Sequence, residues 1–143
     1  MDLTVRDARA ADAEDIARLL DQLGYPSGAS AVAARLERLA IVGDRVVVAE
    51  LEERAVGLAH LHVTPALERD RPAAKIAALV IDESHRRRGV GRALVEAVEE
   101  EARTRGCELL FVTTAARRDE AHVFYERLGF EQTGRRYART LNE

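Results

Sequence analysis

The chain has 143 residues, of which 47% are hydrophobic and 33% charged, and it carries a formal net charge of −3. This length suits one domain that buries about two-thirds of its unfolded surface without disulfides or metals, and the composition excludes a disordered chain. The charge argues against a dedicated nucleic-acid binder, and the single cysteine, Cys107, excludes an internal disulfide and a cysteine-rich metal site. The chain shows neither a signal-peptide pattern nor an apolar run of membrane-spanning length, so we expect one cytoplasmic domain over residues 1–143.

The first forty residues predict one strand and two helices. Leu3 to Ala8 alternate in polarity like a half-buried strand. Asp12 stands where a helix N-cap is expected, and Gly24 marks the end of that helix. The apolar face of the helix carries Ile16, Leu19, Leu20 and Leu23. Ser30 stands at the cap position of a second helix, which is expected to run to about Ala40.

The middle of the chain predicts a β-hairpin, a strand and a helix. Residues 45–63 contain two apolar runs around the polar turn Glu52 to Arg54. Residues 64–74 form a loop with a proline near each end. The nearly continuous apolar run of residues 75–81 is typical of a strand covered on both faces. Residues 89–105 then place apolar side chains at helical spacing.

The last third of the chain predicts a second buried strand over residues 108–114 and a helix over residues 120–128 that ends at Gly129. Residues 130–141 are expected to supply one or two closing strands. The elements together predict an α/β domain with a mixed sheet, in which antiparallel hairpins precede a strand–helix–strand unit.

An arginine-rich turn leads into the helix predicted over residues 89–105, in the stretch SHRRRGVGRALVEA. The first turn of a helix has backbone N–H groups without partners and a partial positive charge, and Gly89 and Gly91 remove side chains that would keep a phosphate away from them. The arginines at 86–88 add forked donors that match phosphate oxygens. The alternatives are an ordinary solvated helix start and a nucleic-acid patch. Only 4% of residues are aromatic, which leaves little for bases to stack on, and the place between a buried strand and a helix favours a phosphate-binding loop.

The spacing within this loop excludes two common phosphate-binding motifs. A P-loop needs four residues between its glycines, and a dinucleotide-binding loop needs a glycine where Leu94 stands. Arg86-x-x-Gly89-x-Gly91 instead resembles the acetyl-CoA pyrophosphate loop of the GNAT N-acetyltransferase superfamily. LVIDESHR resembles the splayed fourth strand of that superfamily, and AHVFYERLGF, residues 121–130, resembles its C-terminal helix and turn. Within the superfamily, the chain looks most like aminoalkylphosphonate N-acetyltransferases and small bacterial amine acetylases.

This resemblance covers almost the whole chain and implies both a fold and an activity. The implied fold is a mixed, mostly antiparallel sheet of six to seven strands flanked by about four helices. The implied activity is transfer of an acetyl group from acetyl-CoA to a primary amine, with CoA as product. The implied cofactor contacts are the backbone of Leu79, Val80 and Ile81 for the acetyl and pantetheine groups, the loop residues Arg86, Arg87, Arg88, Gly89, Val90, Gly91 and Arg92 for the pyrophosphate, and Phe124.

Tyr125 stands where the family has its general acid. Attack of an amine on a thioester expels a thiolate, and a phenol with a pKa of about 10 can protonate that thiolate where a carboxylate cannot. The alternative for Tyr125 and its neighbour Phe124 is packing within the helix core. The loop and the Gly-Phe turn that follows the helix favour catalysis.

The sequence departs from the family at Lys75, because many members carry a glutamate at the start of this strand and a lysine cannot replace that carboxylate. His60 and His62 on the preceding strand share a face with Val56 and Leu58, and a hairpin would bring His62 towards Lys75. Histidine has a reference pKa of about 6.5, which suits a group that takes a proton from an ammonium. The alternatives are a polar pair at the strand end and a lysine that reaches into water.

Lys75 also bears on the substrate. A cation in the amine-binding region would repel a polyamine or an aminoglycoside and attract an amine that carries a carboxylate, phosphonate or phosphate. We therefore expect a small-molecule amine with an anionic group, such as an amino acid or an aminophosphonate, and no nucleic-acid, membrane or metal partner. Two other functions stay open: a protein N-terminal or lysine acetyltransferase, and a non-catalytic acyl-CoA sensor. A homodimer also stays open.

Overall fold

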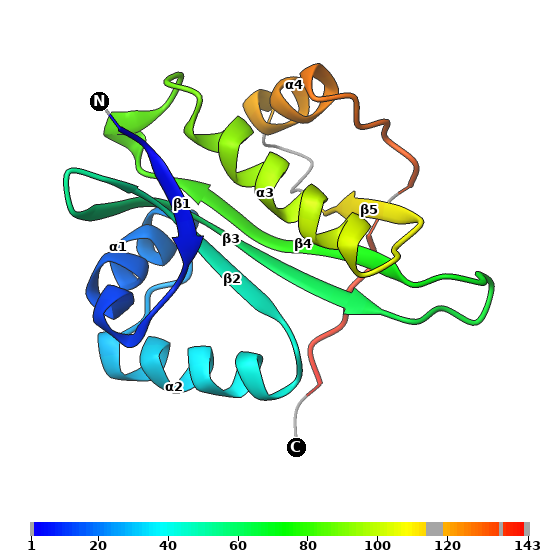
Figure 1. Cartoon of the computed structure of the whole chain (residues 1–143), viewed down its shortest axis with the longest axis horizontal. Coiled ribbons are helices and arrows are strands. Elements are labelled where there is room, and N and C mark those ends of the chain that lie inside the picture. The colour runs from blue at the N-terminus through cyan, green and yellow to red at the C-terminus, as the bar shows by residue number, and fades with distance from the viewer. Residues whose placement is uncertain (1, 114–118, 135, 142–143) are drawn as a thin grey trace. The chain divides into compact units, whose positions relative to one another are not determined.

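The computed structural model describes residues 2–113, 119–134 and 136–141. The chain divides into two compact units, Met1–Phe111 and Val112–Glu143, and the single domain expected from the sequence stays a prediction. In chain order the elements are β1 Thr4–Asp7, η1 Ala10–Asp12, α1 Ala13–Leu23, α2 Ala29–Ile41, β2 Arg45–Leu51, β3 Arg54–Thr64, β4 Ala73–Ile81, η2 Glu83–His85, α3 Val90–Thr104, β5 Leu109–Val112 and α4 Asp119–Arg127 (Figure 1). In the part of the chain described, none of these helices has the length and apolar character needed to cross a membrane.

The strands form one five-stranded sheet in the order β1–β2–β3–β4–β5. The pairs β1–β2, β2–β3 and β3–β4 are antiparallel, and α3 carries the chain from β4 to β5. Glu52 and Glu53 both have positive φ values and make the tight turn between β2 and β3 that the sequence predicts. The predicted α/β class, with a mixed and mostly antiparallel sheet and four α-helices, is therefore confirmed.

The sheet has fewer strands than the six to seven expected, because the chain after α4 adds none within the described residues. Residues 130–134 and 136–141 follow an irregular path. A closing strand would need an apolar face to bury, but Tyr137 and Leu141 are 90% and 89% exposed. β5 also differs from the buried strand expected over residues 108–114, since it is shorter and contains no fully buried residue.

Neither of the first two α-helices begins with the side-chain cap that the sequence suggests. Asp12 precedes α1, but its carboxylate accepts hydrogen bonds from both terminal nitrogens of Arg6, at 2.9 Å each, and from the backbone N–H of Arg9 at 2.8 Å. The bond from Arg6 is the main cause that holds the pKa of Asp12 below its usual value. α2 begins one residue before Ser30, which therefore lies inside the first turn and is not its cap.

Different helices cover the two faces of the sheet (Figure 1). α1 and α2 pack on one face, where the buried cluster comprises Ala13, Ile16, Leu19, Val32, Val48, Ala55, Leu58 and Val80. α3 packs on the other face, where a Cβ added to Gly57 would lie only 3.0 Å from side-chain atoms of Val90 and Leu94. A glycine at this position therefore lets the first turns of α3 approach β3 closely.

Two register shifts change which side chains share a face of the sheet. The first, between Ala49 and Glu50 of β2, makes Val56 an extra residue on β3. Ala55 therefore joins Leu58 in the buried cluster beneath α1 and α2, and Val56 does not. The alternation expected from the sequence is wrong at Val56 for this reason.

The second shift, between His60 and Leu61, makes Ala77 an extra residue on β4. β3 itself continues without interruption, so His60 and His62 stay on the face covered by α1 and α2. Beyond the bulge, His62 and Lys75 are cross-strand partners. The sequence-based prediction that these two residues meet is confirmed, since partners in an antiparallel pair project to the same face.

Candidate active site

The turn that leads into α3 has the backbone geometry expected of a phosphate-binding loop. Gly89 is the N-cap of α3 and has a φ of +80°, in the left-handed region that favours glycine. Arg87 has a φ of +64°, which is uncommon for a residue with a side chain and is typical of functional sites. Helix geometry leaves the amides of Val90, Gly91 and Arg92 without partners inside α3. With the helix dipole, these amides offer a site for an anion.

Four arginines around this turn carry charges that no described residue neutralises. Arg86, Arg87, Arg88 and Arg92 are exposed and make no hydrogen bond or ion pair to any residue that the structure describes. Arg54, by contrast, is also exposed but forms an ion pair at 2.6 Å. Unpaired guanidinium groups beside free amides fit the phosphate oxygens of the cofactor that the sequence implies. Binding by these residues stays a prediction.

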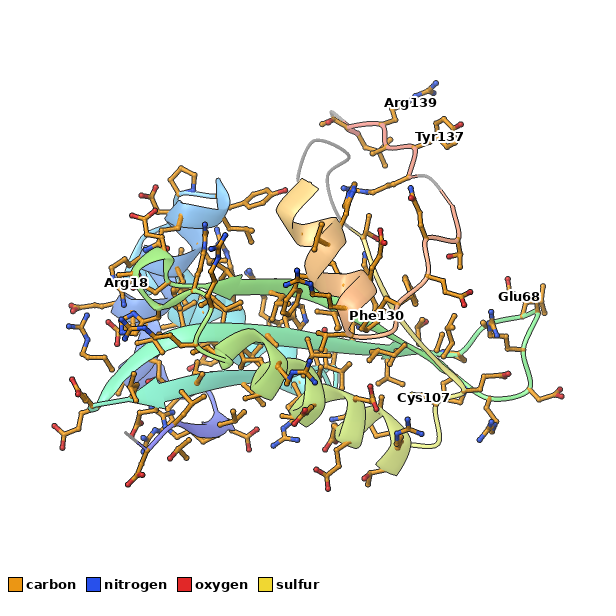
Figure 2. The ribbon with its side chains drawn as sticks, turned by 90° about the horizontal axis from the view of Figure 1, so that it is seen from above. Arg18, Glu68, Cys107, Phe130, Tyr137 and Arg139 are labelled. Carbon is orange, nitrogen blue, oxygen red and sulfur yellow. The ribbon has the colours of Figure 1, made fainter. Side chains whose placement is uncertain are left out.

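A buried carboxylate anchors the segment between β4 and this turn. Asp82 directly follows β4 and accepts hydrogen bonds from Nη1 of Arg18 and Nε2 of Gln22, both on α1 and both at 2.8 Å. Figure 2 labels Arg18 among the side chains. Asp82 also accepts hydrogen bonds from the hydroxyl of Ser84 and, at 2.8 Å, from Nδ1 of His85. The hydrogen bonds from Gln22 and Ser84, more than the charge of Arg18, hold the pKa of Asp82 well below its usual range.

α1 therefore holds the start of the turn in place. The side-chain oxygen of Gln22 accepts a hydrogen bond from the backbone N–H of Glu83 at 3.0 Å, and the backbone N–H of Asp82 bonds to the carbonyl of Val56 at 2.8 Å. Sequence reasoning missed this anchor, because Arg18 lies 64 residues from Asp82 along the chain. The feature of the sequence that could have drawn attention to Asp82 is its position directly after a buried strand.

Replacing Asp82 with asparagine should lower stability by an amount that depends on pH. The folded pKa of Asp82 is depressed, so its contribution is fully present above the unfolded pKa of about 4 and is lost as the pH falls further. We expect the variant to be less stable than wild type by about 1.5–3 kcal/mol at pH 7, the size of hydrogen bonds to a charged group. Urea unfolding at several pH values measures this difference. A difference that stays constant from pH 7 to about pH 2 would contradict the assignment.

The backbone positions implied for the acetyl group lie on the same segment. Leu79, Val80 and Ile81 are the last three residues of β4, directly before Asp82. They pair with β3 on one edge, and β5 is the neighbour of β4 on the other. The structure thus joins these three residues to the phosphate-binding turn in one stretch of the first unit, while their contact with a cofactor stays a prediction.

The two candidate bases share a carboxylate that sequence reasoning did not single out. Nε2 of His60 and Nδ1 of His62 each lie 2.7 Å from an oxygen of Asp44. Burial alone would raise the pKa of Asp44, but the hydrogen bonds from the two histidines outweigh burial and lower it. Lys75, opposite His62, is half-buried and makes no hydrogen bond or ion pair with the described residues. Among all the residues that the structure describes, no group of three or more His, Cys, Asp or Glu side chains could hold a metal ion.

Phe124 and Tyr125 lie on α4, in the second unit. The Tyr125 ring makes edge-to-face contacts with Phe124 and Phe130, with ring centroids 5.2 and 5.7 Å apart. α4 ends at Arg127 and is followed by a turn in which Gly129 has a φ of +91° and the N–H of Phe130 bonds to the Tyr125 carbonyl at 3.0 Å. Packing thus orients the phenol, and its role as the acid stays a prediction.

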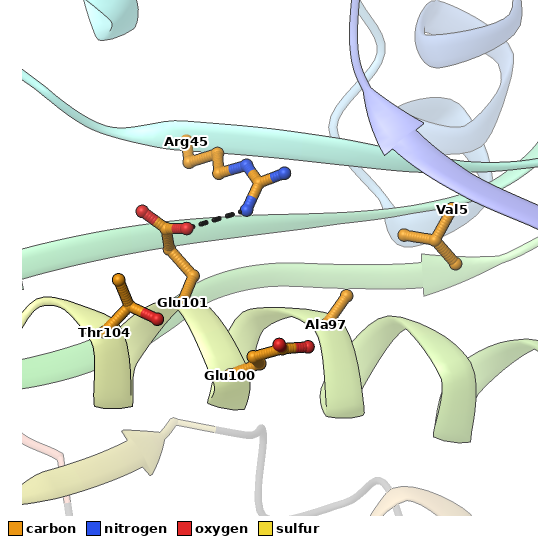
Figure 3. Close-up of a pocket in the computed structure, with 6 residues that line it drawn as sticks. All are labelled: Val5, Arg45, Ala97, Glu100, Glu101 and Thr104. Carbon is orange, nitrogen blue, oxygen red and sulfur yellow. Dashed lines mark hydrogen bonds and ion pairs between the residues drawn. The ribbon is translucent and has the colours of Figure 1, made fainter.

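A hollow of about 340 Å³ lies along the C-terminal half of α3, away from the phosphate-binding turn (Figure 3). Its lining comprises Val5, Arg45, Ala97, Glu100, Glu101 and Thr104. Arg45 is the cation in this lining, and it is already paired with Glu101 at 2.9 Å and with Asp7 at 2.7 Å. The hollow therefore suits neither a phosphate nor the reaction, and it contains none of the predicted site residues.

Comparison with known proteins identifies relatives that are similar to this chain in sequence and in fold. The model of the acetyltransferase (GNAT) family matches residues 13–130. An aminoalkylphosphonate N-acetyltransferase from Salmonella typhimurium is 35% identical over 86 residues, which are 60% of this chain and 56% of that protein, so the match spans little more than half of the relative.

Two further similarities extend over nearly the whole chain. A glucosamine 6-phosphate N-acetyltransferase from Trypanosoma brucei brucei is 28% identical over 137 residues, 90% of this chain and 91% of that protein. The crystal structure of a Trypanosoma brucei acetyltransferase superposes with a TM-score of 0.84 at 28% identity, covering 98% of this chain and 100% of that one.

Proposed function

The chain belongs to the acetyltransferase (GNAT) family, and on that premise we propose that it moves the acetyl group of acetyl-CoA to the primary amine of a small molecule that also carries an anionic group. An amino acid or an aminophosphonate fits this description. The observation that carries the proposal is Lys75, a half-buried cation without a described partner beside the candidate base His62.

The residues of the turn before α3 fit the diphosphate of the cofactor. Four guanidinium groups that have no partner among the described residues, together with the amides of the first turn of α3, supply positive charge and donors on one short segment. Gly89 keeps the approach to these amides open, since a side chain is absent there. When bound, acetyl-CoA supplies a thioester whose acetyl group an amine can attack.

The protein's own residues then handle the protons. An amine at neutral pH is an ammonium and must lose a proton before it can attack, and we assign that proton to the histidine pair on β3. Tyr125 provides the proton that the departing sulfur needs, because a phenol of pKa about 10 is acidic enough to protonate a thiolate but stays protonated at pH 7. Each of the two roles moves a single proton.

Lys75 selects among amines by charge. A unit charge about 4–6 Å from the Lys75 ammonium interacts with it by on the order of 3–4 kcal/mol at an effective dielectric near 20, before desolvation is subtracted. The interaction energy that remains after desolvation favours an anionic group on the substrate and disfavours a second ammonium. The names of two relatives, an aminoalkylphosphonate and a glucosamine 6-phosphate N-acetyltransferase, describe amines with phosphonate or phosphate groups and so support the proposal.

Replacing Lys75 with glutamate should reverse this preference. We expect the ratio of kcat/KM for 2-aminoethylphosphonate to that for ethylenediamine to fall at least tenfold, since the variant exchanges attraction for repulsion. Release of the CoA thiol measures both rates. Arg103→Glu is the control: it makes the same change of charge on α3, which covers the opposite face of the sheet, and should leave the ratio within about twofold.

An unchanged ratio in Lys75→Glu would contradict the proposed selection by charge. Thiol release with peptides but with none of the small amines would instead favour a protein substrate. These outcomes are distinct, because the first compares two small amines and the second compares classes of acceptor.

A further inference from the structure

Asp44 joins the histidine pair to the segment between α2 and β2, and nothing in the family resemblance assigns it a role. Its side chain is only 6% exposed, and each of its oxygens lies 2.7 Å from a different imidazole nitrogen, Nε2 of His60 and Nδ1 of His62. We infer that Asp44 is a positioning residue, which holds His62 with its proton on Nδ1 and leaves the Nε2 lone pair to accept a proton from the amine substrate. This inference rests on the proposed function.

The chemistry of a carboxylate determines where each imidazole proton lies. An ionised carboxylate only accepts hydrogen bonds, so each nitrogen that faces Asp44 must donate. The lowered pKa of Asp44 means that this group is ionised at neutral pH. Neutral His60 therefore carries its proton on Nε2 and neutral His62 carries its proton on Nδ1. The two rings are opposite tautomers held by one carboxylate, which leaves Nδ1 of His60 and Nε2 of His62 as lone-pair nitrogens.

Exposure separates the two histidines. The side chain of His62 is 45% exposed and that of His60 is 19% exposed. The free Nε2 of His62 is at the outer end of its ring, whereas the free Nδ1 of His60 is next to its own Cβ and backbone. Sequence reasoning left the choice of base open, and the geometry points to His62.

Charged groups from two other segments lie beside His62. Asp44, between α2 and β2, faces its Nδ1, and Lys75 on β4 is its cross-strand partner. His60 shares the carboxylate. Arg45, which follows Asp44 in the chain, is occupied by its ion pairs with Asp7 and Glu101.

The protons balance over one cycle. The substrate ammonium passes one proton to Nε2 of His62, and the freed lone pair forms the carbon–nitrogen bond as the carbon–sulfur bond breaks. Tyr125 gives its proton to the departing sulfur and regains one from the substrate nitrogen. His62 then releases its proton to water, so that one proton leaves for each amide formed. The carboxylate of Asp44 stays ionised throughout and changes no bond.

A matched pair of variants separates this role from a purely structural one. His60 and His62 make equivalent bonds to the same carboxylate. If these bonds only tied the α2–β2 segment to β3, His60→Gln and His62→Gln would lower kcat by similar factors. We expect His62→Gln to lower kcat roughly 10²-fold, the usual size of a lost base, and at least tenfold further than His60→Gln. Acetyl-CoA affinity, measured by calorimetry, should match wild type in both. Equal losses of kcat would overturn the inference.

A spectroscopic measurement tests Asp44 without relying on turnover. In ¹⁵N spectra of the histidine rings of the wild-type protein at pH 8, the Nδ1 of His62 should give a protonated signal and the Nε2 an unprotonated one. Asp44→Asn replaces one acceptor oxygen by an NH₂ donor, so both rings can no longer donate to it. We expect mixed tautomers in this variant and a kcat lowered roughly 10–100-fold, with rescue in Asp44→Glu of part of that loss.

Wild-type spectra with the His62 proton on Nε2 would overturn the role of Asp44, and they do so even if Asp44→Asn does not fold. Absence of thiol release by the wild-type protein with every amine would overturn the proposed function instead. A functioning enzyme whose kcat survives His62→Gln would contradict only the assignment of His62.

Discussion

Replacing Gly89 with glutamate should weaken acetyl-CoA binding at least 100-fold and leave a folded protein. The new carboxylate would lie at the start of α3, where the free amides and the unpaired guanidinium groups are expected to hold the pyrophosphate. A negative charge there repels the phosphates and competes for the same donors. Calorimetric titration with acetyl-CoA gives the affinity, and thermal unfolding gives the stability.

Gly106 offers a control at the other end of the same helix. Its φ is +77°, close to the +80° of Gly89, and at neither glycine would an added Cβ meet another atom within 4 Å. Gly106→Glu therefore imposes similar backbone strain, about 1–2 kcal/mol, far from the phosphate-binding turn. Both variants should lose similar stability, and only Gly89→Glu should lose binding. Wild-type affinity in Gly89→Glu would show that the turn does not bind the cofactor.

Replacing Tyr125 with phenylalanine should lower kcat roughly 10²-fold or more while acetyl-CoA affinity is kept, since the variant lacks only the proton donor. The aromatic ring remains, so its edge-to-face contacts with Phe124 and Phe130 are preserved. A loss confined to kcat is therefore a loss of chemistry and not of packing. Steady-state thiol release and calorimetry measure the two quantities separately.

Tyr137 provides the matched control in the second unit. Its side chain is exposed, so Tyr137→Phe removes the same hydroxyl from a position outside the proposed site and should leave kcat within about twofold. If Tyr125→Phe also turned over at the wild-type rate, Tyr125 would be a packing residue, and the departing sulfur would take its proton from water.

The parts of the site that sequence reasoning predicted are those specified by neighbouring residues. The turn before α3 could be located because Arg86, Gly89 and Gly91 lie within one short segment between a strand and a helix, and its binding of phosphate stays a prediction. The meeting of His62 and Lys75 follows from the alternation of two consecutive strands, and the register of the hairpin confirms it. Local sequence pattern was therefore sufficient to locate the turn and to predict the pairing of His62 with Lys75.

The parts that were missed or wrong depend on partners distant in the chain. Asp82 owes its place to Arg18 and Gln22 on α1, and Asp44 owes its place to histidines on the far side of a hairpin. Asp12 fails as a cap because Arg6 takes its carboxylate. A single sequence does not show these pairings, because tertiary packing decides which side chains bind a given carboxylate.

Acetyl transfer by the wild-type protein to 2-aminoethylphosphonate and to ethylamine tests the central claim most directly. These two primary amines differ only in the phosphonate, so the ratio of their kcat/KM values reports what an anionic group contributes. We predict release of the CoA thiol with formation of the N-acetyl product, seen by mass spectrometry, and a kcat/KM at least tenfold higher for 2-aminoethylphosphonate. Equal values for the two amines would contradict selection of an anionic substrate, and absence of any acetylated product from a panel of small amines and peptides would contradict the enzymatic function itself.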